Sequence, residues 1–65
     1  MSYSVHQFAK AQRDALNKRL DEIAKTMTEG QVTDWPHYKA LSGEAKGIRV
    51  AIAKLDESLT RYDED

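Results

Sequence analysis

The sequence predicts an all-α fold, an antiparallel two-helix hairpin of coiled-coil type that oligomerises into a helical bundle. Apolar residues recur at helical spacing over two long segments, which is the pattern of amphipathic helices. The break between the segments spans about five residues, a length that favours antiparallel neighbours. The 65 residues form one domain without cysteine, so disulfides cannot support the small core, and we expect oligomerisation to do so.

The first helix is expected over about residues 4–28. Ser2 or Ser4 can cap it, because a serine oxygen accepts a free amide at a helix start. Gly30 is expected to end it, since glycine most easily adopts the left-handed conformation of a C-terminal cap, and the turn should span about residues 29–33. The apolar residues that form one stripe along this helix are Val5, Phe8, Ala9, Leu16, Leu20, Ile23 and Met27.

The second helix is expected over about residues 34–62. Thr33 or Asp34 is its natural N-cap, and Pro36 falls in the first turn, where its missing N–H is not needed. The last three residues are acidic and lie at the negative end of the helix dipole, so we expect fraying after Tyr62.

A regular heptad pattern runs along the second helix. Its members alternate spacings of three and four: Tyr38, Leu41, Ala45, Ile48, Ile52, Leu55, Leu59 and Tyr62. Such a seam packs against another helix, and the first helix of the same chain is the nearest partner. We therefore expect this seam to form the interior of the hairpin.

Two glycines, Gly43 and Gly47, interrupt the second helix, and each costs about 1 kcal/mol relative to alanine. At 100° per residue they fall on the side opposite the seam, among mostly small residues. Because a surface without long side chains lets another backbone approach closely, we predict an interface with a second copy or a partner protein there. The predicted interface residues are Ala40, Gly43, Gly47, Val50, Ala51 and Lys54. The alternative is that the glycines accommodate a curve or face solvent.

Composition excludes several classes of protein. The chain has 10 basic and 11 acidic residues, and the net charge of −1 argues against a general nucleic-acid binder. No apolar run approaches the roughly 20 residues of a membrane span, and the N-terminal segment lacks the apolar region of a secretion signal. Because the sequence begins with Met1, we expect a complete small protein. Because no secretion signal is recognised, we expect it in the cytoplasm.

The richest candidate for ligand contact is the start of the second helix, where Trp35, His37, Tyr38 and Lys39 cluster. Aromatic rings stack on bases, and the free amides of a helix start attract phosphate. The structural alternative is that Tyr38 belongs to the seam and Trp35 covers the end of the hairpin. No nucleophile, base and orienting group can be combined, so we expect no enzyme, catalytic residue, cofactor or metal site.

The pattern T-D-W-x-x-Y-x-x-L-x-G-x-x-x-G-I-x-x-A resembles short helical-hairpin proteins of tailed bacteriophages that are encoded among head and packaging genes. The matching residues are Thr33, Asp34, Trp35, Tyr38, Leu41, Gly43, Gly47, Ile48 and Ala51. The resemblance covers the second half of the chain. It implies a viral protein with a virion-associated or head-assembly role, located in the host cytoplasm or in the virion.

A weaker resemblance concerns Pro36-His37-Tyr38-Lys39, which is similar to the start of a long helix in phage anti-CBASS sponge proteins. That resemblance implies an oligomer that sequesters cyclic nucleotides, with Trp35, Tyr38 and Lys39 at a pocket between subunits. Three hypotheses follow. The chain self-associates or docks on a larger phage assembly, acts as a cyclic-nucleotide sponge, or inhibits a host protein through an acidic or apolar face.

Overall fold

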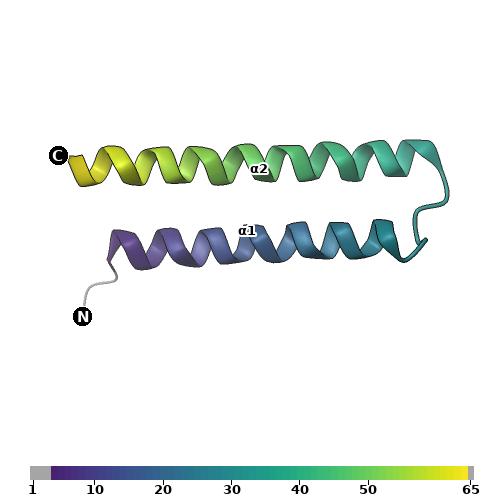
Figure 1. Cartoon of the computed structure of the whole chain (residues 1–65), viewed down its shortest axis with the longest axis horizontal. Coiled ribbons are helices and arrows are strands. Elements are labelled where there is room, and N and C mark those ends of the chain that lie inside the picture. The colour runs from purple at the N-terminus through teal and green to yellow at the C-terminus, as the bar shows by residue number, and fades with distance from the viewer. Residues whose placement is uncertain (1–3, 65) are drawn as a thin grey trace.

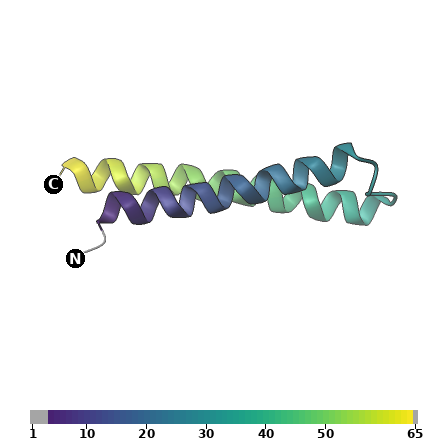
Figure 2. The same cartoon turned by 90° about the horizontal axis from the view of Figure 1, so that it is seen from below.

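The computed structural model describes residues 4–64, which form two helices joined by a short turn (Figure 1). Helix α1 spans Val5–Thr28 and helix α2 spans Trp35–Glu64. The helices run in opposite directions and bring residues 4 and 64 to the same end, and Figure 2 shows them crossing at a shallow angle. No strand occurs in this part of the chain. The predicted all-α helical hairpin is therefore confirmed.

Helix α1 begins with a reciprocal cap. The Ser4 hydroxyl accepts a hydrogen bond from the Gln7 amide at 3.1 Å, and the Gln7 side-chain oxygen accepts one from the Ser4 amide at 3.0 Å. This capping box satisfies amides that have no partner inside the helix. Ser4 is thus the cap, while the other candidate, Ser2, lies outside the described residues.

The turn follows the predicted glycine signal. Gly30 has a φ of 72°, and the Gln31 amide donates to the Thr26 carbonyl at 3.3 Å, as in a Schellman motif. Across the turn, the Asp34 carboxylate accepts a hydrogen bond from the His37 amide at 2.8 Å, so Asp34 caps α2. Both helix boundaries at the turn therefore come from local hydrogen bonding.

The end of α2 differs from the prediction. The helix continues through Asp63 to Glu64, two residues beyond the expected end at about Tyr62, and Asp65 lies outside the described residues. Asp63 is held by His6 of α1, with 3.0 Å between Oδ1 and Nε2. Arg61 adds a cation in the last turn, where the helix dipole favours positive charge. A contact between the helices thus offsets the unfavourable acidic end.

The interior of the hairpin is shallow. Within residues 4–64, the buried hydrophobic residues are Ala9, Ile23 and Ala45. The two ends of the predicted seam are open, because Tyr38 is 42% exposed and Tyr62 is 56% exposed. The seam residues that are buried or half-buried against α1 are Leu41, Ala45, Ile48, Ile52, Leu55 and Leu59. Most of the predicted seam therefore packs against α1, but this single helix leaves the two ends of the seam exposed.

Candidate functional site

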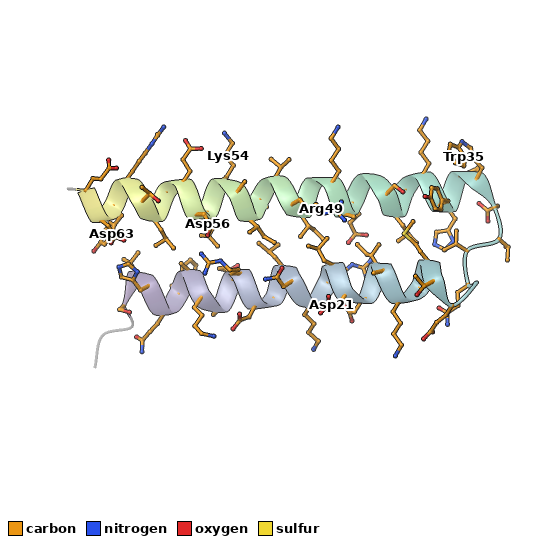
Figure 3. The ribbon with its side chains drawn as sticks, in the orientation of Figure 1. Asp21, Trp35, Arg49, Lys54, Asp56 and Asp63 are labelled. Atoms are coloured by element: carbon orange, nitrogen blue, oxygen red, sulfur yellow. The ribbon has the colours of Figure 1, made fainter. Side chains whose placement is uncertain are left out.

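The strip of small residues lies on the side of α2 that faces away from α1. Every predicted interface residue is exposed: Ala40, Gly43, Gly47, Val50, Ala51 and Lys54. A Cβ atom added at Gly43 or Gly47 would meet no atom within 4 Å outside the local helix backbone. Figure 3 shows Lys54 pointing away from α1. Nothing in the described chain requires glycine at these positions, and the strip is open to another molecule.

Lysines border this strip. Lys39 and Lys46 lie within about 80° of Lys54 around the helix. None of the three has an ion-pair partner among residues 4–64. Two copies joined symmetrically through this strip would bring like charges together. The border therefore favours a partner that presents neutral or acidic groups.

The aromatic residues at the start of α2 form a stack. The rings of Trp35 and Tyr38 lie 5.5 Å apart with an angle of 18° between their planes. Trp35 stays 68% exposed at the turn end of the hairpin (Figure 3), so it stacks on a neighbour and leaves the seam uncovered. Lys39 lies about 40° from Trp35 around the helix, whereas His37 lies about 160° away. The predicted cluster is thus divided between two sides of α2.

One ion pair joins the helices through two hydrogen bonds. The Arg19 guanidinium donates from Nε to Oε2 of Glu44 at 2.5 Å and from Nη2 to Oε1 at 2.8 Å. Hydrogen bonding from Arg19 lowers the pKa of Glu44, and the same contact raises the pKa of Arg19. Because both side chains are exposed, the pair contributes mainly to the alignment of the helices.

The lowered pKa of Glu44 predicts a specific dependence of stability on pH. The usual value is 4.5, so the pair contributes fully above this pH and is lost as the pH falls through the lowered pKa of the folded state. Glu44→Gln should therefore lose less stability than the wild type between pH 5 and strongly acidic conditions. Urea unfolding across this range measures the effect. Equal slopes for wild type and Glu44→Gln would contradict the assignment.

An apolar groove opens at the end of the hairpin where residues 4 and 64 lie. Its volume is about 220 Å³ and its lining comes from both helices: Val5, Phe8, Ala9, Leu55, Ser58, Leu59 and Tyr62. Phe8 is 54% exposed and Val5 is 42% exposed. Both residues belong to the packing stripe expected from the sequence, and the stripe did not predict this groove. The signal was present, because Phe8 lies about 80° away from the centre of that stripe.

Comparison with known proteins adds no assignment: no family matches the sequence, and no similar curated protein or solved structure is found. Within residues 4–64, neither helix has a segment long and apolar enough to cross a membrane. The same residues contain no group of three or more potential ligands placed to hold a metal ion. The strip, the aromatic stack and the groove are therefore the candidate sites.

Proposed function

We propose that the chain is a non-enzymatic, self-associating hairpin of coiled-coil type that docks on a larger protein assembly. The observation that supports it is the incomplete interior. In the described residues, Ala9, Ile23 and Ala45 are buried, while Phe8, Trp35 and other large apolar residues remain exposed. A chain of this size commonly needs partner subunits, because its own core buries too little surface.

The resemblance to phage hairpin proteins supplies the setting of the proposal. On this resemblance alone, we propose a viral head-assembly role, in the host cytoplasm or on the particle. Mass spectrometry of purified virions tests a virion-associated role, since a resident component would be found in stoichiometric amounts. Absence from particles would restrict the chain to a transient assembly role.

Self-association is tested by the mass of the protein in solution. Sedimentation equilibrium at increasing micromolar concentrations should show a dimer or a larger assembly, and native mass spectrometry should give the subunit number. A stable monomer over this range would contradict the proposal.

The open glycine strip leads to a prediction about docking or assembly. Gly43→Leu with Gly47→Leu should abolish close contact at the strip, because two branched side chains would separate the approaching backbones. The helices should persist, since leucine is a better helix former than glycine and each new side chain enters open space. Circular dichroism and sedimentation measure the two effects separately.

A matched control uses two exposed alanines away from the strip. Ala24→Leu with Ala53→Leu adds the same side chains to both helices and should leave assembly unchanged. Unchanged assembly in the glycine double variant as well would remove the strip from the proposal.

The aromatic stack supports a second candidate, a cyclic-nucleotide sponge. Trp35 presents an exposed ring beside Tyr38, and Lys39 lies on the same side of the helix, which suits stacking on a base next to a phosphate. Calorimetry with cyclic di- and trinucleotides should detect binding that Trp35→Ala weakens. The absence of heat across such a panel would eliminate this candidate.

A further inference from the structure

This inference rests on the proposed self-association. We infer that two hairpins pair through one broad face of each, which we call the apolar face. The two copies are related by a two-fold axis parallel to the helices. The apolar face is the broad face that contains the groove. Near the open end it is formed by Phe8, Leu55, Ser58 and Tyr62 of the groove lining. Helical periodicity adds Ala11, Gln12, Ala15 and Ala51 to the same face. The occupant of this face is a second copy of the chain.

The two broad faces of the hairpin differ in their charged residues. Near the open end, His6–Asp63 and Arg13–Asp56 join the helices by ion pairs. Around α1, Phe8 is turned by about 160° from His6 and about 140° from Arg13, so Phe8 and these ion pairs lie on opposite broad faces. Tyr62 lies between the two faces at the open end, with its ring 6.2 Å from that of His6.

No charged residue is among those that form the apolar face near the open end, and several of them are large and exposed. Tyr62 is 56% exposed and Phe8 is 54% exposed. Uncharged, partly aromatic surface of this kind is typical of the centre of a protein interface. The opposite broad face carries ion pairs, and charged side chains favour its exposure to solvent.

The area of the face is sufficient for a second copy. The hairpin extends 47 by 22 by 13 Å, and Figure 1 looks along the shortest of these directions, onto a broad face. One broad face therefore offers about 1000 Å² per copy, above the roughly 800 Å² per partner that stable interfaces bury. Full overlap of two hairpins meets this requirement, whereas half overlap does not.

The position of Arg19 and Glu44 selects the axis. Arg19 lies within about 20° of Phe8 around α1, and Glu44 has the same direction as Tyr62 around α2, so this ion pair belongs to the apolar face nearer the turn. A lengthwise axis places α1 of each copy over α2 of the other, with the same ends together. Groove then meets groove, and each Arg19 faces Glu44 of the second copy.

An axis across the hairpin is unfavourable. With full overlap, it would place the Arg19–Glu44 pair of one copy over Ala15 and Ala51 of the other and bury charges against apolar side chains. If the axis passed through the groove, the charges would stay apart but less than half of each face would be covered. Both arrangements make neighbouring helices antiparallel, as in an up-down four-helix bundle, so the charges and not the helix directions select the lengthwise axis.

The face is tested by Phe8→Gln. We expect the dissociation constant of the dimer to rise at least about tenfold, because an aromatic ring in the uncharged part of the interface is lost. Sedimentation equilibrium measures it, and circular dichroism checks that the exposed substitution leaves the helices intact. The control is Asn17→Ala, which truncates an exposed side chain turned by about 180° from Phe8 around α1 and should leave the dimer unchanged. Wild-type assembly that persists in Phe8→Gln would overturn the assignment of the face.

The axis is tested by cross-linking, since the chain has no native cysteine. Ala15 and Ala51 are exposed on the apolar face, at a level between the Arg19–Glu44 and Arg13–Asp56 pairs. A mixture of Ala15→Cys and Ala51→Cys chains should form the mixed disulfide on mild oxidation. Disulfides that join two Ala15→Cys chains or two Ala51→Cys chains, without the mixed disulfide, would overturn the lengthwise axis. The absence of any disulfide in a mixture that still assembles would also overturn it. A monomeric wild type would overturn the proposed self-association itself, so the two failures are distinguishable.

Discussion

Replacing Ile23 with alanine is expected to remove much of the stability of the fold. Ile23 is the largest fully buried side chain among the described residues, with 2% of its surface exposed. Removing such a side chain costs about 2–5 kcal/mol, because apolar contacts are lost and a cavity remains. A chain of this length has a total stability of roughly 3–10 kcal/mol. Thermal unfolding followed by circular dichroism should show a large fall in the midpoint or the loss of a cooperative transition.

Two further variants calibrate this result. Ile23→Val removes a single methylene and should cost about 0.5–1.5 kcal/mol. Lys25→Ala truncates an exposed residue on the same helix and should change stability by less than about 0.5 kcal/mol. If Ile23→Ala unfolded at the same temperature as Lys25→Ala, the shallow interior would not be the source of stability.

Replacing both helical glycines with alanine is expected to stabilise the hairpin. Gly43→Ala with Gly47→Ala should raise the free energy of unfolding by up to about 2 kcal/mol, because alanine loses less backbone entropy in a helix. Each added methyl group enters open space in the single chain. Urea unfolding at several protein concentrations separates this change from any change in assembly.

A third glycine provides a control for the sign of the change in unfolding free energy. Gly30→Ala is the same substitution at a residue with φ of 72°, and it should destabilise the chain by about 1 kcal/mol because alanine is strained there. A more stable hairpin that assembles less well would support contact at the strip. A more stable hairpin with unchanged assembly would favour glycines that merely face solvent, and no gain in stability would contradict the open surroundings of both residues.

The fold was predictable because its determinants are local. The heptad seam from Tyr38 to Tyr62, the cap at Ser4 and the left-handed glycine at position 30 can each be recognised within a few residues of sequence. The end of α2 was not predictable in this way. There, Asp63 finds its partner in His6, far away in sequence, and this contact offsets a local preference for fraying.

The candidate sites were predictable to a different extent. The exposed strip around Gly43 and Gly47 follows from helical periodicity alone, since it lies opposite the seam. The groove depends on how α1 is rotated about its own axis relative to α2. That rotation decides whether the Phe8 side chain is buried or exposed. Ion pairs between the helices, such as Arg19–Glu44, indicate the rotation, but they are known only from the three-dimensional structure. The stack of Trp35 on Tyr38 depends on side-chain rotamers, which the sequence pattern does not specify.

Because residues 4 and 64 lie together at the grooved end, the choice of fusion site affects what a binding experiment measures. An affinity tag or fluorescent protein attached at either of these positions would crowd the apolar residues through which the copies are proposed to meet. An insertion beside Gly30, at the opposite end of a hairpin 47 Å long, would keep the label away from them. A label in the turn therefore suits assays of association, and a terminal label offers a deliberate way to obstruct it.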